Sequence, residues 1–493
     1  MRARIWLGVL VASGGLFGIY ACSSSPVGVC EIPGVCTADG SADVKVDVGD
    51  TGADAPPVTC PSGKEPKDDP TCVTNDLGIF VSAGGNDSDP GTKEKPVATL
   101  GAALTKAGSG GKGKVFVCEG SYTESATIKA TVGVYGGFKC SDWSYTGTKP
   151  KFAGAKPDFV IKVDGASGVT LADLELDGKD GAPNSGESSV ALIISNSAQT
   201  RAQRLKAIAG IGASGPDGEV KPFSFSAPPT GGVAAGTTGG AAITNNCPGG
   251  DTSQGGKGGN GTLQAPFYLG GDGLPALGAG DGGTGGSACS PGVDGNPAPA
   301  ASAASGAVVT GAVSTSWNPA AGGDGVAGKP GQGGGGGGGR DTGALQGGGG
   351  GGGTGGCGGA GGGGGKGGGG SISLLSINSG LDLADCELVA STAGKGGVGK
   401  AGQAGQSQVG AAGSSQSPGC SGGIGGAGGA GGAGGGGAGG ISVGILYKGT
   451  KPVTDSATDG KITVGTKGTK GLGGASPTND GIDGVAQAVL QAP

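Results

Sequence analysis

Short apolar runs alternate along the chain with long stretches that carry almost no large side chain. The runs lie between residues 78 and 210, and Gly, Asn, Asp or Pro bounds each of them. Apolar runs of this length, alternating with polar residues, predict short β-strands separated by turns. The predicted strands cover residues 78–82, 114–118, 126–130, 133–136, 159–163, 169–176 and 190–194. Residues 96–107 differ, because Val97, Leu100 and Leu104 fall on one face and predict a helix.

Two internal repeats organise these runs. The sequence Leu-Ala-Asp-Leu-Glu-Leu at 171–176 returns at 383–388 as Leu-Ala-Asp-Cys-Glu-Leu. A larger unit of apolar strand, turn, second strand and Gly tract begins at residues 189, 371 and 441. Short repeated strands that cannot bury their own faces favour a solenoid. Because each Gly tract follows the second strand, we expect the tracts to leave the solenoid at one corner.

The Gly residues are concentrated in two insertions. Gly accounts for 126 of the 493 residues, and most of the excess lies in residues 211–369 and 394–440. We favour the interpretation that these insertions are disordered low-complexity loops. The alternative is a bundle of extended helices with three residues per turn, in which Gly lets the backbones touch.

The N-terminus has the features of a targeting segment. Residues 1–21 combine Arg2 and Arg4 with a short apolar run, and Cys22 follows Ala21. This resembles a bacterial lipobox, in which the Cys receives lipid and anchors a soluble remainder. An ordinary secretory peptide is the alternative, and both predict export. Residues 22–75 form an acidic, Cys-containing tether.

Composition excludes several chemistries. The absence of His removes Ser/His/Asp triads and His-ligated metals. Without Arg2 and Arg4, 30 basic residues face 38 acidic ones, and a net charge of −8 disfavours nucleic acid as a partner. Residues 394–401 look like a phosphate-binding loop, but Ala401 replaces the hydroxyl residue that would bind Mg²⁺, so we expect no nucleotide site.

Cysteines are the next candidates. Twelve are present, and an exported chain uses them mainly as disulfides. If Cys22 carries lipid, pairing of sequence neighbours leaves Cys386 as a buried thiol. The hypothesis comprises Cys30–Cys36, Cys60–Cys72, Cys118–Cys140, Cys247–Cys289 and Cys357–Cys420.

One carboxylate group could carry chemistry. Asp173, Glu175 and Asp177 are spaced by two residues, which predicts one face of one strand. Paired carboxylates can hold Ca²⁺ or cleave polysaccharides by acid–base chemistry. The simpler interpretation is a solvated strand face.

Three motifs resemble the start of a known fold. Residues 81–92 read Val-Ser-Ala-Gly-Gly-Asn-Asp-Ser-Asp-Pro-Gly-Thr, residues 119–122 read Glu-Gly-Ser-Tyr, and residues 135–138 read Tyr-Gly-Gly-Phe. They resemble the N-terminal cap of right-handed parallel β-helices of the pectin-lyase-like superfamily, and more narrowly a group of exported Gly-rich bacterial lipoproteins. The resemblance implies adjacent coils that bring Cys118 and Cys140 within bridging distance. It says almost nothing about activity.

These observations predict an all-β chain, a right-handed parallel β-helix with long Gly-rich loop insertions. A cap and coils would occupy residues 76–210, a coil residues 370–393, and the last coils residues 441–493. We expect an outer-membrane or cell-surface lipoprotein with a structural or adhesive role, favour a non-enzymatic one, and expect no cofactor. Its partners would be the membrane, through lipid, and envelope, matrix or polysaccharide components. The alternative is a Ca²⁺-dependent protein that binds or cleaves polysaccharide.

Overall fold

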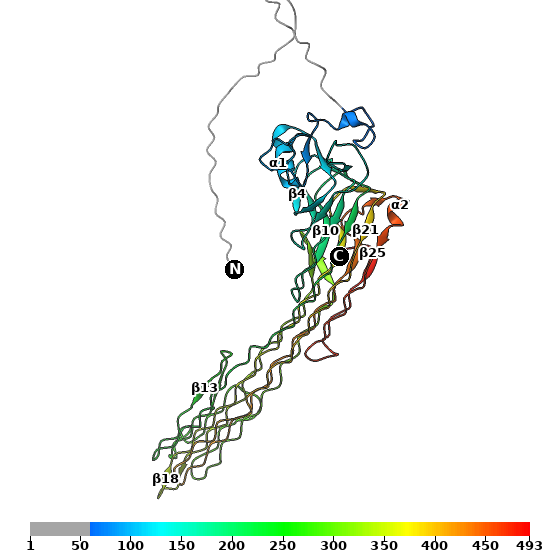
Figure 1. Cartoon of the computed structure of the whole chain (residues 1–493). Helices are drawn as coiled ribbons and strands as arrows, with labels where there is room; N and C mark the ends of the chain where they lie inside the picture. Colours follow the sequence, from blue (N-terminus) through cyan, green and yellow to red (C-terminus); the bar gives the residue numbers. More distant parts are fainter. Residues whose placement is uncertain (1–59) are drawn as a thin grey trace, which may run out of the picture. The chain divides into compact units, whose positions relative to one another are not determined.

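The computed structural model describes residues 60–493, and Figure 1 shows two kinds of architecture in them. Near α1 (Leu100–Gly110) and α2 (Ser456–Asp459) lie three sheets of parallel strands, and beyond them long extended segments run side by side. A 3-10 turn at Pro70–Cys72 is the other helical element of the described part. No helix within residues 60–493 is both long enough and apolar enough to cross a bilayer.

Nearly all of the regular structure belongs to three parallel sheets. Sheet A pairs, in order, β1 (Gly78–Val81), β2 (Lys114–Cys118), β5 (Gly133–Phe138), β8 (Thr170–Ala172), β11 (Thr200–Gln203), β20 (Leu381–Ala384) and β23 (Val453–Thr454). Sheet B pairs β3 (Ser121–Thr123), β6 (Lys151–Ala153), β9 (Glu175–Asp177), β12 (Lys206–Ile208), β21 (Glu387–Val389) and β24 (Ile462–Thr463). Sheet C pairs β4 (Ala126–Ile128), β7 (Ile161–Asp164), β10 (Ser189–Ser195), β19 (Ser371–Ile377), β22 (Ser442–Lys448) and β25 (Ala486–Gln491).

The chain visits the three sheets in turn. From β2 onward, a strand of sheet A is followed by one of sheet B and one of sheet C, and each pass pairs with the pass before it. The register aligns the first two repeats, because Ser371 pairs with Ser189, and places the third one residue later than the sequence suggested, because Ser371 pairs with Ser442 on its other side. The first strands of the three predicted repeats are therefore neighbours in sheet C.

A left-handed residue divides the run over residues 169–176, which the sequence predicted as one strand. Asp173 has a φ of 57° and separates β8 from β9. Asp385, between β20 and β21, has a φ of 53°, and Arg204, between β11 and β12, has a φ of 49°. Asp is among the residues that tolerate this conformation. The single-strand expectation is wrong, because the chain turns from sheet A into sheet B at this position.

One apolar cluster draws on all three sheets. Leu171 from sheet A, Leu176 from sheet B and Leu192 from sheet C are fully buried in it. Helix α1 packs on the same cluster through Leu100 and Ala103. Apolar burial therefore holds the sheets together and fixes the helix against them.

Helix α1 begins within the segment that the sequence predicted, but later, at Leu100. Thr99 is the N-cap, and its hydroxyl accepts a hydrogen bond from the Ala102 N–H at 3.1 Å. The Asp87 carboxylate accepts from the Ala98 and Thr99 N–H groups, both at 2.9 Å. Glu124 accepts from the Leu100 N–H at 2.8 Å. These acceptors satisfy N–H groups that the first helical turn leaves free.

The Gly-rich segments leave the sheets at one corner, as the repeats suggested. They follow β12, β21 and β24, all in sheet B, and the chain returns each time into sheet C, at β19, β22 and β25. Three short hairpins lie in the first insertion: β13 (Thr244–Asn246) with β14 (Thr252–Gln254), β15 (Gly311–Val313) with β16 (Trp317–Pro319), and β17 (Arg340–Asp341) with β18 (Gln346–Gly347).

Outside the hairpins, the Gly-rich segments form a bundle of extended chains joined by backbone hydrogen bonds at every third residue. The Gly325 N–H donates to the Gly362 carbonyl at 2.8 Å, and Gly328 and Gly331 donate to Gly359 and Gly356. Residues 350–368 in turn donate to residues 420–438, again in steps of three. Three residues is the period of an extended left-handed helix, which cannot pair its polar groups internally.

Glycine is required in this bundle because the chains touch through their backbones. A Cβ on Gly218 would lie 1.9 Å from the Gly363 carbonyl oxygen, and one on Gly358 would lie 1.9 Å from that of Gly328. Residues 331–339 and 347–360 are buried without a large apolar side chain among them. The structure thus differs from the disordered loops that we favoured, and matches the alternative of bundled extended helices.

Candidate functional site

Four disulfides join the cysteines of the described part. Cys60 is bonded to Cys72, and Cys118 of β2 to Cys140, which follows β5 in the next pass. These are pairs that the sequence suggested. Cys386 is the free, buried cysteine of the described residues. The lipidation candidate Cys22 and the pair Cys30 and Cys36 lie outside them.

The other two suggested pairings are wrong. The bonds join Cys247 to Cys357 and Cys289 to Cys420. The sequence separations are 110 and 131 residues, so neighbours in the sequence are a poor guide here. In the bundle, the chains that lie side by side come from distant parts of the insertions, and the second bond ties one insertion to the other.

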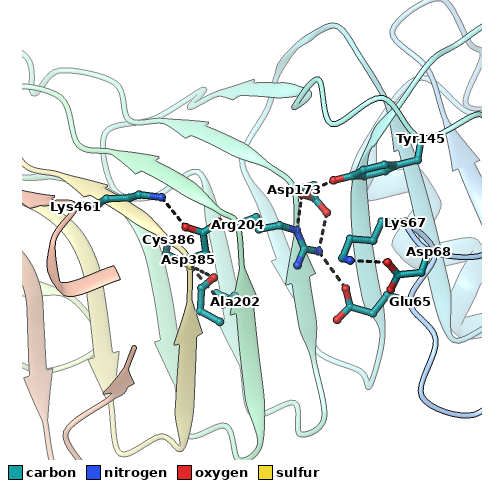
Figure 2. Close-up of polar contacts among 11 residues, drawn as sticks. Glu65, Lys67, Asp68, Tyr145, Asp173, Ala202, Arg204, Asp385, Cys386 and Lys461 are labelled. Carbon is teal, nitrogen blue, oxygen red and sulfur yellow. Dashed lines mark hydrogen bonds and ion pairs between the residues drawn. The ribbon is translucent and has the colours of Figure 1, made fainter. Parts of the chain in front are cut away.

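The carboxylate candidate Asp173 is engaged in an ion pair at the corner between sheets A and B. Figure 2 shows the Arg204 side chain beside it, with Nε 2.8 Å from Oδ1 and Nη2 2.9 Å from Oδ2. The Tyr145 hydroxyl donates to the same carboxylate at 3.0 Å, and Arg204 also contacts Glu65 at 3.2 Å. Only 3 % of Asp173 is exposed. Although burial opposes the charged form, Asp173 raises the pKa of Arg204 above its ordinary value.

The expected face of three carboxylates is therefore not formed. Glu175 and Asp177 lie on β9, whereas Asp173 precedes the strand at the left-handed corner. The Asp177 carboxylate pairs with Lys151 at 2.7 Å. Within residues 60–493, no three or more His, Cys, Asp or Glu side chains form a group that could hold a metal ion. The Ca²⁺-dependent alternative loses the arrangement on which it was based.

The second copy of the repeat has an equivalent corner at Asp385, between sheets A and B, where the ion pair is exposed to solvent. Asp385 contacts Lys461 at 2.5 Å, and both side chains are about half exposed. The adjacent Cys386 thiol is buried and donates to the Ala202 carbonyl at 3.3 Å (Figure 2). Burial raises the pKa of Cys386, so the thiol stays protonated and packs as a small apolar group.

The surface has two grooves large enough to hold a small ligand. One, of about 460 Å³, lies between α1 and residues 127–132 and is lined mostly by small and apolar residues. The other, of about 630 Å³, lies on the bundle beside residues 216–223. Two of its three acids are engaged, because Asp217 pairs with Lys400 at 2.9 Å and Asp324 accepts from the Gly364 N–H at 2.7 Å. The side chain of the third acid, Glu219, has no hydrogen-bond or ion-pair partner in the part of the chain that the structure describes. We assign no catalytic role to either groove.

The outer end of the bundle, remote from the sheets, presents a different surface. It consists of the turns at residues 261–267, 286–290, 341–346 and 416–419, with β18 beside them (Figure 1). Leu263, Phe267 and Leu345 are exposed there by 58 %, 54 % and 64 %. The Cys289–Cys420 disulfide ties the turn at residues 286–290 to the residue that follows the turn at 416–419. Exposed apolar side chains on fixed turns are the property of a contact surface.

Comparisons with known proteins add no relative: no family model, curated protein or solved structure matches this sequence. The sequence alone did not point to the outer end. Its signal there is a short cluster of large side chains, Leu263, Phe267, Tyr268 and Leu269, within a Gly-rich insertion. That signal is visible in the sequence, but only the fold shows that these residues share one end of a bundle.

Proposed function

We propose that this chain is an exported surface lipoprotein with a structural or adhesive role. In this proposal a right-handed, three-sided parallel β-helix supports a stiff Gly-rich bundle, and the outer end of the bundle makes the contact. Lipid on Cys22 would hold the chain at the membrane, with the residues before Cys60 as the tether. Residues 60–75, which the sequence assigned to the tether, are folded instead, since Cys72 and Val73 are buried and Glu65 contacts Arg204.

The β-helix part of the proposal is supported by the order of the strands. The chain passes through sheets A, B and C in turn, and one apolar cluster contains residues from all three. Export is supported by four disulfides in the described part, because such bonds persist in oxidising compartments.

The observation that carries the adhesive role is the apolar outer end. A Gly backbone core needs few side chains, yet Leu263, Phe267 and Leu345 stand exposed on its terminal turns. Exposing such side chains has no benefit for folding. The Cys289–Cys420 bond joins two other segments of the same end, which limits how far the end can rearrange before a partner arrives.

Attachment of cells that display the full chain tests this role. The triple variant Leu263→Ser, Phe267→Ser, Leu345→Ser should abolish attachment to a surface coated with extracellular matrix polysaccharide and protein. A matched control, Val308→Ser with Val453→Ser, changes residues that are exposed by 79 % and 64 % but lie near the sheets, and should attach normally. Attachment by the triple variant at the wild-type level would refute the role. Separately, Cys22→Ala should abolish incorporation of a labelled fatty acid.

A further inference from the structure

Strand β25 is the last strand of sheet C and has a neighbour on one side only. It pairs with β22, and within residues 60–493 no strand pairs with its other side. Figure 1 shows β25 at the border of the sheets, on the side away from α1. An uncovered strand edge presents free N–H and C=O groups, to which a further strand can add.

The other edges of the three sheets are covered or short. At β1, the Phe80 N–H donates to the Gly91 carbonyl at 2.9 Å, and the Phe80 carbonyl accepts from the Val97 N–H at 3.0 Å. Helix α1 lies beside β4. Strands β3, β23 and β24 have three, two and two residues, whereas β25 has six. Residues 484–492 also contain no charged residue and no Pro, which commonly protect an edge.

The backbone groups that face away from β22 lie near both ends of β25. The Val485 carbonyl accepts a hydrogen bond from β22 at 2.9 Å, and the Ala492 N–H donates one to β22 at 2.8 Å. Successive residues of a strand direct their backbone groups to opposite edges. Ala486 and Gln491, the first and last residues of the strand, therefore direct their N–H and C=O groups toward the open side.

We propose that two copies of this chain join through β25, with the two strands antiparallel about a two-fold axis between Ala488 and Val489. In this arrangement Ala486 of one copy lies opposite Gln491 of the other, and the two residues exchange N–H···O=C hydrogen bonds. The two positions are equally far from the axis, so the pair occurs twice and the edge complements itself, as a two-fold contact requires. Six residues at ~3.4 Å each give an edge of about 20 Å.

The surroundings of β25 favour a second copy over a single added peptide. Val453 of β23 and Val464, which follows β24, are exposed by 64 % and 36 %, and Val489 and Leu490 of β25 are half-buried. The last strands of all three sheets thus expose apolar side chains. A peptide strand would cover β25 alone, whereas the same end of a second copy would also cover its neighbours.

The lack of charge on β25 also fits this partner. A two-fold axis places each side chain near its own counterpart, and like charges opposite each other on paired strands are destabilising. A strand without charged residues avoids that repulsion. This inference does not rest on the proposed adhesive role.

Analytical ultracentrifugation of the full, disulfide-intact chain tests the proposal, with Cys22→Ala in every sample so that lipid does not drive association. The chain should form dimers. Ala486→Pro removes an N–H that faces the open side and breaks no bond to β22, so it should raise the dissociation constant of the dimer at least about tenfold and leave the circular dichroism unchanged. Ala486→Ser keeps the N–H and should dimerise normally. A chain that is monomeric at every concentration, or a dimer that Ala486→Pro does not weaken, overturns the proposal.

Crosslinking on cells that display the full chain locates the contact. Ala488→Cys places an exposed thiol beside the proposed axis, and oxidation with copper phenanthroline should link two copies into a dimer on a non-reducing gel. Ala130→Cys is the control, because Ala130 is equally exposed but follows β4, at the opposite edge of sheet C. It should remain monomeric. Equal crosslinking of the two variants, or capture of a different protein by Ala488→Cys in place of a second copy, would contradict the proposal.

Discussion

Arg204 donates two hydrogen bonds to Asp173 from the equivalent corner of the next pass through the sheets, with both residues in the left-handed conformation. The pair joins consecutive passes at the turn from sheet A to sheet B, and the contact of Arg204 with Glu65 adds the segment next to the Cys60–Cys72 bond. Its role is therefore structural. Removing the cationic partner of a buried carboxylate lowers the free energy of unfolding, because the remaining charge is buried without compensation.

Arg204→Ala should destabilise the chain by about 3 kcal/mol, because it leaves Asp173 buried without a counter-charge. Lys461→Ala is the matched control, since it removes the exposed partner of Asp385 at the equivalent corner and should cost less than about 1 kcal/mol. Urea unfolding of both variants measures the difference. Equal losses would contradict the structural role of the Arg204–Asp173 pair.

Gly358→Ala should destabilise the bundle by about 1–3 kcal/mol, because its Cβ would collide with the backbone of Gly328. Gly249→Ala is the control, as the nearest atom to a Cβ there belongs to the Phe223 ring at 3.6 Å. It should change stability by no more than about 0.5 kcal/mol. Thermal unfolding followed by circular dichroism distinguishes them, and a tolerant Gly358 would argue against the backbone-packed core.

Peptide mapping without reduction should recover Cys247 linked to Cys357 and Cys289 linked to Cys420. The double variant Cys289→Ser, Cys420→Ser opens a loop with a sequence separation of 131 residues. In the chain-entropy model this lowers the free energy of unfolding by about 4–5 kcal/mol. Recovery of a Cys247–Cys289 peptide instead would contradict the arrangement of the bundle.

Glu124→Gln should gain stability relative to the wild type as pH rises. Burial raises the pKa of Glu124 above 4.5, against the Leu100 and Gly101 N–H bonds that lower it. A raised pKa in the folded state makes the contribution of the carboxyl largest below its unfolded pKa, and that contribution is lost as pH rises through the folded pKa. The Gln variant stays neutral and keeps an acceptor for α1, so its advantage should vanish near pH 4.

Unfolding of wild type and Glu124→Gln between pH 4 and pH 8 provides the measurement. Glu124→Ala is the control, because it loses the acceptor as well as the charge and should cost about 1 kcal/mol even at low pH. If the difference in free energy of unfolding between Glu124→Gln and wild type is the same at every pH, the raised pKa of Glu124 is contradicted.

How much the sequence predicts depends on where the signal lies. The run at 189–195 and its repeats at 371 and 441 are found as β10, β19 and β22 because both faces of these strands are apolar. Strand β11 was missed, since only Ala202 of its Thr-Arg-Ala-Gln sequence has an apolar side chain. A single left-handed residue such as Asp173 leaves no periodic signal in the sequence. The prediction therefore put Asp173 on one strand with Glu175 and Asp177, which is wrong.

The prediction of disordered Gly tracts was wrong for a different reason. Methods that count apolar residues find no core in residues 331–339, because the buried groups there are backbone atoms. The disulfide partners depend on which extended chains are neighbours, and a tract of near-identical triplets gives no local sign of its register. Residues 422–433 repeat Gly-Gly followed by Ile or Ala, and this period of three residues is a sign of order that the sequence does contain.

The spacing of the hydrogen bonds also sets how this protein can change in length. Each bundle chain contacts its neighbours once per three residues, so an insertion of one or two residues would turn side chains into the backbone core. Adding three residues to each of two neighbouring chains that are joined by a turn keeps their hydrogen bonds in register. It moves that turn further from the sheets by the length of three residues. The reach of the bundle can thus evolve by triplets while the sheets that support it stay the same.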